Sequence, residues 1–454
     1  MKSVAFHNLG CKVNSYELDV MQQMMAEKGY EIVPFSQKAD IYIVNTCTVT
    51  NIADRKSRQM LHRAKQLNPD GVVVAVGCYV QTDTKGARKD ESIDLCIGNN
   101  RKKDILPILE EYLRQREENR ADKTLEDTTV IDINHTDEYE EMCLKQTSEH
   151  TRAYIKIQDG CNQFCSYCAI PLARGRVRSR RPESILEEIR GLVASGYREV
   201  VLTGIHISSY GLDFEGERVY RGESRLMDLV EQIHEVPGLD RIRLGSLEPR
   251  IVTMENVKRM AALPKLCPHF HLSLQSGCDA TLERMNRHYT TAEFMEGVEA
   301  LRSVFDGPAI TTDVIVGFPG ETEEEFAETK AFLERVHFFE MHIFKYSKRS
   351  NTRAAIMPNQ VRDEVKTRRS NELLAMEQAH SQEFRKKYLG RTAGVLLEEE
   401  KTIEGRNYWL GHTEDYVKFA VKAGEGYASN QFVQLTGKKF LTEEIILGEE
   451  AIVF

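Results

Sequence analysis

The stretch Gly160-Cys161-Asn162-Gln163-Phe164-Cys165-Ser166-Tyr167-Cys168 places three cysteines within eight residues, at the spacing C-x3-C-x2-C. Three thiolates so close together suit a four-iron cluster that keeps one iron open for a further ligand. A structural zinc needs a fourth Cys or His nearby, whereas the next histidine is His206. We therefore predict an iron–sulfur site, with zinc and unligated buried cysteines as the alternatives.

Apolar runs alternate with helical patterns around and beyond this cysteine loop. The expected strands are residues 154–158, 199–203, 241–245, 269–274, 310–316 and 339–346. The expected helices are residues 182–195, 226–235, 255–263, 279–285, 292–304 and 322–336. This order predicts an α/β domain at residues 151–388 that forms a partial (βα)6 barrel, with the cysteine loop after its first strand.

Polar residues fall where these strands end, which is where barrels of this type carry their chemistry. Thr203, Glu248 and Gln275 occupy such positions, although turn chemistry also explains Thr203 and Glu248. Asp313 interrupts an apolar strand, so its carboxylate must be paired or line a wet site.

Residues 1–115 repeat the alternation in a shorter form. Strands are expected at 4–9, 41–45, 72–76 and 93–97, with helices at 15–28, 53–66 and 102–116. This pattern predicts an open parallel sheet with helices on both faces. Cys11, Cys47 and Cys78 follow the first three strands, at the edge where open sheets bind ligands. We predict that they hold a second iron–sulfur cluster; the alternative is that each is a small buried hydrophobe. Cys96 and Cys143 are predicted not to be ligands.

Charge is distributed unevenly along the chain, whose net charge is −9. Residues 110–150 carry 13 acids and 5 bases, and we interpret 116–150 as an acidic linker with a solvated charged face and one short strand at 128–133. Residues 174–181 instead carry five arginines and no acid. Such a local basic stripe can bind phosphates on an otherwise acidic protein.

Hydrophobicity and cysteine content indicate where in the cell the protein is located. No apolar run reaches the ~18 residues of a membrane helix, and the N-terminus lacks the pattern of a signal peptide. Ten cysteines without that signal indicate a reducing compartment. We expect a cytoplasmic protein with no membrane partner.

The C-terminal part changes character twice. A polar helix is expected at 359–388, with Arg362, Lys366 and Arg369 on one face, which is solvated by default and contacts phosphate in the alternative. Residues 389–454 show short alternating runs that predict a small antiparallel β-barrel. Such barrels often bind oligonucleotides, but this one has 11 acids and 7 bases. A packing or substrate-orienting module is the other interpretation.

Taken together, these motifs resemble the radical S-adenosylmethionine (SAM) methylthiotransferase family. The resemblance rests on the cysteine loop and its continuation 169–180, and on three later stretches, His271-Leu272-Ser273-Leu274-Gln275-Ser276-Gly277, Arg284-Met285-Asn286-Arg287 and Thr312-Asp313-Val314-Ile315-Val316-Gly317-Phe318-Pro319-Gly320-Glu321-Thr322. It covers essentially the whole chain. It implies an N-terminal methylthiotransferase domain at 1–115, a radical SAM domain at 151–388 and a TRAM domain at 389–454.

Three stretches resemble the branch of the family that modifies threonylcarbamoyladenosine (t6A) beside the tRNA anticodon. They are Leu9-Gly10-Cys11-Lys12-Val13-Asn14, Leu202-Thr203-Gly204-Ile205-His206 and Tyr346-Ser347-Lys348-Arg349. The sequence departs from the family at Ser350-Asn351, where Pro-Gly is expected, and at Cys278, where Ser is usual. The first departure puts the local loop geometry in doubt.

The resemblance implies conversion of t6A to 2-methylthio-t6A at C2 of the adenine. It implies two [4Fe-4S] clusters, SAM used once as methyl donor and once as radical source, and a cluster-bound sulfide as the sulfur source. The metal ligands would be Cys161, Cys165 and Cys168 in one cluster and Cys11, Cys47 and Cys78 in the other. The implied partners are the tRNA anticodon stem-loop carrying t6A and an electron donor such as flavodoxin or ferredoxin.

Further site residues follow from the same resemblance. We expect Tyr167, Thr203, Glu248, Gln275 and Asp313 to contact SAM. Arg174, Arg176, Arg178 and Arg180 are expected either to contact tRNA phosphates or the threonyl carboxylate, or to form ion pairs between domains. The alternative substrates are isopentenyladenosine in tRNA and a ribosomal protein side chain. A non-catalytic iron–sulfur or zinc RNA-binding protein is the alternative from another class.

Overall fold

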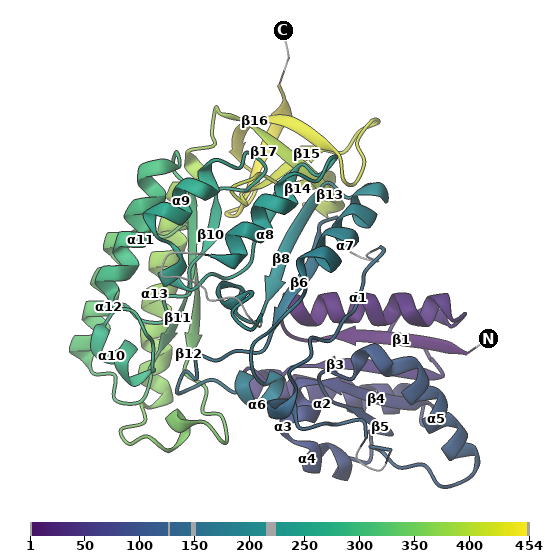
Figure 1. Ribbon diagram of the computed structural model, residues 1–454. Helices are drawn as coiled ribbons and strands as arrows, with labels where there is room; N and C mark the ends of the chain where they lie inside the picture. The colour runs from purple at the N-terminus through teal and green to yellow at the C-terminus, as the bar shows by residue number, and fades with distance from the viewer. Residues whose placement is uncertain (1, 126–127, 147–150, 215–223, 452–454) are drawn as a thin grey trace.

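The computed structural model describes residues 2–125, 128–146, 151–214 and 224–451. It has three parts, which Figure 1 shows from purple to yellow along the chain. The N-terminal sheet domain packs beside the central partial barrel through α1 (Lys12–Glu27), and the C-terminal barrel lies at the far end of the central strands.

The N-terminal domain is the expected open parallel sheet, with strand order β2-β1-β3-β4-β5. Its strands are β1 (Ser3–Asn8), β2 (Glu31–Val33), β3 (Ile41–Thr46), β4 (Val72–Gly77) and β5 (Leu95–Ile97). Its other helices are α2 (Asn51–Leu67), α3 (Cys78–Thr82), α4 (Thr84–Lys89) and α5 (Ile105–Glu117). Every residue of β3 and β4 is buried, because helices cover both faces of a parallel sheet. The short strand β2 and the short helices α3 and α4 were not predicted.

The acidic linker differs from the expectation in two ways. No strand forms in its described residues; a 3-10 turn, η2 (Ile133–His135), follows the predicted strand positions. The segment also packs against the domain, since Cys96 N donates to Lys123 O at 2.7 Å and Gly98 N donates to Thr129 O at 2.8 Å. The acidic composition of the segment does not predict this packing, because the apolar residues that drive it are few and spaced apart.

The central domain contains all six predicted parallel strands. They are β6 (Ala153–Asp159), β8 (Glu199–Gly204), β9 (Arg241–Leu244), β10 (His269–His271), β11 (Ala309–Val316) and β12 (Glu340–Lys345). Two sheets, β7-β6-β8-β9 and β10-β11-β12, are joined by the single bridges Ile242↔Leu266 and Leu247↔Leu272. The two-residue strand β7 (Arg178–Ser179) pairs antiparallel with β6 and was not predicted.

Helices cover the outside of this partial barrel. They are α7 (Pro182–Ala194), α8 (Arg225–His234), α9 (Met254–Ala261), α10 (Asp279–Arg284), α11 (Thr291–Val304) and α12 (Glu323–Val336), whereas the short helix α6 (Ile170–Arg174) packs against α3 of the N-terminal domain (Figure 1). Capping boxes fix where two of them begin: Thr290 with Glu293 for α11, and Thr322 with Glu325 for α12. Among the described residues, every helix is too short or too polar to cross a lipid bilayer.

The long helix α13 (Asp363–Lys386) corrects the expectation of a solvated basic face. Arg369 is buried and forms ion pairs with Glu321 and Glu323, at 2.5 and 2.8 Å. Lys366 is also buried, with its ammonium 5.6 Å from the Tyr346 ring centroid. Lys366 and Arg369 therefore hold α13 against the central domain, whereas Arg362, which precedes the helix, is exposed as expected.

The C-terminal part is a closed five-stranded barrel with the order β13-β14-β15-β17-β16. Its strands are β13 (Thr392–Ile403), β14 (Arg406–His412), β15 (Lys418–Lys422), β16 (Phe432–Phe440) and β17 (Ile445–Glu450). The predicted antiparallel pairing holds except between β15 and β17, which run parallel.

A loop of this small barrel closes the N-terminal end of the central strands. The Tyr416 ring stacks between His269 and His412, with centroids 5.0 and 4.6 Å away. Arg243 donates to the carbonyl oxygens of Thr413 and Glu414 at 3.3 and 2.8 Å. This placement leaves the opposite end, where the cysteine loop lies, for ligands.

Candidate active site

The cysteine loop 161–168 leaves β6 through a turn that only glycine can make. Gly160 has φ +71°, and a Cβ there would lie 1.7 Å from the Arg176 carbonyl oxygen. The loop is then fastened from both sides, because Ser166 N donates to Met285 O at 2.9 Å and Ala354 N donates to Ser166 O at 2.8 Å. The three thiols are consequently held in place by the backbone around them.

Hydrogen-bond donors already point at the sulfurs of this loop. The backbone N–H of Gln163 donates to Cys161 Sγ at 3.5 Å, and that of Ile170 donates to Cys168 Sγ at 3.4 Å. Arg287 donates from Nη1 to Cys165 Sγ at 3.2 Å. Such bonds stabilise thiolates and tune iron–sulfur potentials. Arg287 lies in a family-like stretch, but nothing in the sequence indicates that it reaches the loop.

The second cysteine triad lies at neighbouring strand ends of the N-terminal sheet. Cys11 follows β1, Cys47 follows β3, and Cys78 follows β4 as the first residue of α3. These strands are adjacent in the sheet, so the three thiols face one space. Electrostatic repulsion from Cys78 contributes to the raised pKa of both Cys11 and Cys47, after burial. The structure therefore places the three cysteines at neighbouring strand ends, as predicted, and their joint ligation of one cluster stays a prediction.

Neither triad has the spacing of four ligands around a single zinc in the described part of the chain. Sulfurs around one tetrahedral zinc stand roughly 3.8 Å apart, because each Zn–S bond is about 2.3 Å. In the described part of the chain, the one group of three ligand atoms within 4.8 Å of one another contains no cysteine. Burial raises the pKa of Cys47 and Cys168 to about 12, so both thiols are protonated near neutral pH unless a metal ion binds them.

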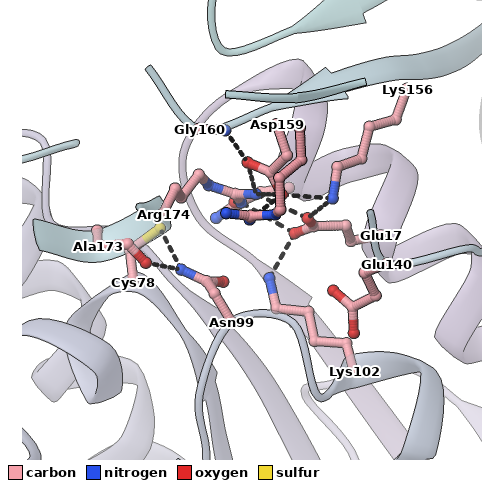
Figure 2. Close-up of polar contacts among 12 residues, drawn as sticks. Glu17, Cys78, Asn99, Lys102, Glu140, Lys156, Asp159, Gly160, Ala173 and Arg174 are labelled. Atoms are coloured by element: carbon pink, nitrogen blue, oxygen red, sulfur yellow. Dashed lines mark hydrogen bonds and ion pairs between the residues drawn. The ribbon is translucent and has the colours of Figure 1, made fainter. Parts of the chain in front are cut away.

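A buried charge network joins the N-terminal domain to the central domain (Figure 2). Glu17 of α1 accepts from Lys156 at 2.7 Å and from Arg174 at 2.8 Å, and it also pairs with Lys102. Arg174 pairs with Asp159 at 3.0 Å. These cations hold the pKa of Glu17 well below its ordinary value despite burial. The sequence did not reveal this network, because its charges come from four separate elements: α1, the 3-10 turn η1 (Lys102–Asp104), β6 and α6.

Asn99 makes a second connection between the two triads. Its amide donates to Ala173 O of α6 at 2.6 Å and to Cys78 Sγ at 3.5 Å (Figure 2). Helix α6 begins two residues after Cys168. One buried side chain thus spans from the N-terminal triad to the exit of the cysteine loop.

The expected SAM contacts occupy the loop and the carboxyl ends of the central strands. Tyr167 packs edge-on against Phe318, with ring centroids 6.3 Å apart. Thr203 lies near the end of β8, and Gln275 has φ +72° just after β10. Glu248 accepts from Arg250 Nε at 2.7 Å. These positions agree with the barrel-end expectation, while contact with SAM stays a prediction.

Asp313 belongs to a polar group inside the barrel. Its carboxylate lies 3.3 Å from His271 Nε2, and the His271 ring stacks against His342 at a centroid distance of 5.8 Å. These residues come from β10, β11 and β12 and are partly accessible. The Asp313 carboxylate is therefore both paired with His271 and partly accessible to solvent, as the sequence predicts.

The arginine stripe is mostly buried. Arg174, Arg178 and Arg180 are each 1% exposed. Arg180 pairs with Glu188 and, at 3.1 Å, with Glu141 of the linker. Arg174 therefore forms the interdomain ion pair given as the alternative, whereas Arg180 pairs within the central domain and with the linker. Arg176 is exposed, with its guanidinium 4.5 Å from the Phe164 ring centroid, so it alone of the four is accessible to RNA.

Comparison with known proteins places this site in a class. The radical SAM superfamily model matches residues 155–333, and a model described as the uncharacterized protein family UPF0004 matches residues 3–98. The solved structure of the radical SAM methyltransferase TsrM from Kitasatospora setae covers 78% of this chain and 77% of its own, with a TM-score of 0.57 and 17% identity. The chain is thus a radical SAM enzyme, a class that carries SAM and a [4Fe-4S] cluster.

Sequence relatives narrow the class. The threonylcarbamoyladenosine tRNA methylthiotransferase MtaB of Bacillus subtilis is 40% identical over 99% of this chain and 100% of its own length. The tRNA-2-methylthio-N(6)-dimethylallyladenosine synthase of Carboxydothermus hydrogenoformans is 34% identical, covering 90% of this chain and 91% of its own. The chain belongs to the radical SAM methylthiotransferase family, and it is a transferase.

Proposed function

We propose that this enzyme is a tRNA t6A methylthiotransferase that converts t6A to 2-methylthio-t6A beside the anticodon. The observation that carries the proposal is the pair of cysteine triads, whose two domains are joined by Arg174 and Asn99. Relatives named for t6A match at 34–40% identity, and those named for dimethylallyladenosine match at 32–34%. The t6A-like motifs around Cys11 and His206 add to this support.

Two [4Fe-4S] clusters are part of the proposal. Cys161, Cys165 and Cys168 would hold one, and Cys11, Cys47 and Cys78 the other. When bound, these clusters and SAM would supply the radical and the methylthio group. The protein's own contribution is positional: the Glu17 network fixes the N-terminal domain against the barrel, and Arg287 stabilises the Cys165 thiolate.

The polar residues at the strand ends would orient SAM. Tyr167 offers an aromatic face beside two ligands, while Thr203, Glu248, Gln275 and Asp313 offer donors and acceptors around the barrel end. The barrel wall and the C-terminal loop at Tyr416 exclude water from the other end. Arg176 is the arginine proposed to meet tRNA phosphate.

The rest of the proposal concerns organisation and partners. Residues 1–115, 151–388 and 389–454 would act as the methylthiotransferase, radical SAM and TRAM domains, joined by the linker at 116–150. We propose a cytoplasmic enzyme that acts on the anticodon stem-loop and receives electrons from a donor such as flavodoxin or ferredoxin.

Reconstitution tests the cluster part of this proposal. The wild-type chain should bind about eight irons, four for each triad. A value near four after full reconstitution would remove the second cluster.

Nucleoside analysis tests the substrate. Stem-loops that carry t6A or isopentenyladenosine should be incubated with the reconstituted enzyme, SAM and a strong reductant. The proposal is supported if the t6A nucleoside gains the mass of a methylthio group and isopentenyladenosine does not. Increase on isopentenyladenosine alone would assign the enzyme to that substrate instead, which relatives at 32–34% identity make the second candidate.

A further inference from the structure

The segment that follows β12 contacts the surroundings of both cysteine triads. It begins with Tyr346-Ser347-Lys348-Arg349, a family-like motif to which the proposed function gives no role. The two triads belong to different domains, so their spacing depends on contacts that cross the domain boundary. The consequence of this segment for catalysis rests on the proposed function, in which both triads act on one adenine.

Arg349 anchors the segment to the N-terminal domain. It is buried and pairs with Asp54 of α2 at 2.7 Å. Its two terminal nitrogens donate to Asn51 Oδ1 and to Thr48 Oγ1, both at 2.6 Å. Because a guanidinium presents its donors in a rigid fork, these contacts fix the start of α2 in one orientation.

Thr48 extends this contact to two of the three N-terminal cysteines. It is fully buried and directly follows Cys47. Its hydroxyl oxygen also accepts from the Thr82 hydroxyl at 3.3 Å. Thr82 ends α3, the helix that begins at Cys78. The guanidinium of Arg349 is therefore linked through one side chain to the ends of two strands that carry cysteines.

A tight turn directs the segment from Arg349 toward the cysteine loop. Thr352 N donates to Arg349 O at 3.3 Å, and the Thr352 hydroxyl donates to the same oxygen at 2.8 Å. Asn351 has φ +65°, in the left-handed region that glycine and asparagine enter most readily. Ser350-Asn351 therefore make a turn with positive φ at its third residue, a position that the expected Pro-Gly also suits.

The other end of the segment is held by the cysteine loop. Ala354 N donates to Ser166 O at 2.8 Å. Ala354 also belongs to a buried apolar cluster with Phe318 and Tyr346, and Tyr167 packs against that cluster. Ser166 and Tyr167 are the two residues between the second and third cysteines of the loop. A short stretch of chain thus connects the surroundings of Cys47 to the cysteine loop.

We propose that Arg349 is a positioning residue that sets the spacing between the two cysteine triads, with the turn 349–352 as a rigid spacer. Spacing matters because a group that reacts with a short-lived radical must already be in place when the radical forms. Without Arg349, SAM would still be cleaved at the cysteine loop, but the N-terminal triad would lie out of reach of the activated adenine.

Hydrogen–deuterium exchange of the full chain without clusters tests the contact path. Arg349→Met removes the contacts to α2 and Thr48, so amides at 48–54 should exchange about tenfold to a hundredfold faster, the range for loss of a charge-assisted hydrogen bond. The acceleration should extend through the turn to 162–168. Asn351→Gly should exchange like wild type, whereas Asn351→Val, strained at positive φ, should resemble Arg349→Met.

Product ratios test the consequence for catalysis. Reconstituted enzyme is incubated with SAM, reductant and a stem-loop carrying t6A, and both 5′-deoxyadenosine and methylthio product are measured. Arg349→Met should still cleave SAM, but its ratio of 5′-deoxyadenosine to methylthio product should rise about tenfold to a hundredfold, the effect of a small misplacement. Arg349→Lys keeps a charge for Asp54 without the fork, so its ratio should lie between those of wild type and Arg349→Met.

Arg243→Met is the matched control, because Arg243 is another buried arginine that joins two domains. It pairs with Glu199 at 3.0 Å and donates to the carbonyl oxygens of Thr413 and Glu414, at the opposite end of the central strands. This variant should exchange faster around Tyr416. Its product ratio and its exchange at 162–168 should remain those of wild type.

The inference is overturned if Arg349→Met keeps the wild-type product ratio, or if its amides at 162–168 exchange as in wild type. Equal loss of 5′-deoxyadenosine and methylthio product would show general damage and would overturn it as well. If Arg349→Met does not fold, Asn351→Val and Asn351→Gly make the same comparison. A wild-type enzyme that adds no methylthio group to t6A fails the proposed function instead, while the exchange data still decide whether the contact path exists.

Discussion

The two cysteine triads reach similar arrangements by opposite routes. The triad at 161–168 comes from one loop, whose backbone is fastened to Met285 and Ala354. The triad of Cys11, Cys47 and Cys78 is assembled from three strand ends, and only sheet topology brings it together. A local triad depends on the loop that carries it, whereas a dispersed triad depends on the fold of a whole domain.

Removing one ligand from each triad should separate their roles most strongly. Cys165→Ala should abolish 5′-deoxyadenosine formation from SAM. Cys47→Ala should keep that activity and lose methylthio transfer. Each variant should retain about four irons, since the other triad is untouched. Product analysis by mass spectrometry checks both, and identical defects in the two variants would contradict separate roles.

Breaking the network between the triads should have the next largest effect. Glu17→Gln leaves Lys102, Lys156 and Arg174 without their shared carboxylate, which should destabilise the protein by about 3–5 kcal/mol. Chemical denaturation of the apo-protein measures the change in the free energy of unfolding. Glu110→Gln, which removes an exposed pair with Lys28, should change little.

The stability of the Glu17→Gln variant should also depend on pH differently from that of wild type. The pKa of Glu17 in the folded protein lies well below its ordinary value of 4.5, so its stabilisation is present above that pH and is lost as pH falls toward the folded pKa. Wild type should therefore lose stability more steeply than Glu17→Gln below pH 4.5. Parallel acid-unfolding curves would contradict this linkage.

Glycines before the cysteines offer a finer comparison. Gly160 has φ +71° and Gly77 has φ +96°, so alanine is strained at both. A Cβ at position 160 would lie 1.7 Å from a backbone oxygen, whereas at 77 the nearest atom is 2.8 Å away on the Asn45 side chain. Gly160→Ala should cost about 2–4 kcal/mol and exceed Gly77→Ala. Thermal unfolding of the apo-proteins compares them, and the reverse order would show that the local loop adapts.

The smallest predicted effect is on the cluster potentials. Arg287→Met removes a hydrogen bond of 3.2 Å to Cys165 Sγ, and Asn99→Leu removes a longer one of 3.5 Å to Cys78 Sγ. Losing about 1 kcal/mol of such stabilisation corresponds to about 40 mV for a one-electron couple. The radical SAM cluster should shift negative by this amount, and the auxiliary cluster by less. Redox titration followed by electron paramagnetic resonance measures both shifts.

The fold was largely predictable because its strands are long and apolar. The sequences of β3 and β4 are buried throughout, and β6 begins the pattern that ends at β12. Strand β2 was missed because its three residues form an edge with little burial. The strand predicted at 128–133 failed because that segment pairs with the sheet domain through a few backbone bonds only.

The candidate site was predictable as far as its cysteines. Their spacing or strand-end position carries the signal by itself. Nothing in the sequence indicates that Arg174 and Arg180 are buried, because their partners Glu17 and Glu188 lie in other elements.

Nucleoside mass spectrometry of a t6A stem-loop, incubated with reconstituted enzyme, SAM and reductant, tests the two-triad account most directly. We predict conversion of t6A to 2-methylthio-t6A by wild type and none by Cys47→Ala. Formation of 5′-deoxyadenosine by wild type with t6A left unchanged would contradict the assignment of the N-terminal triad to methylthio transfer.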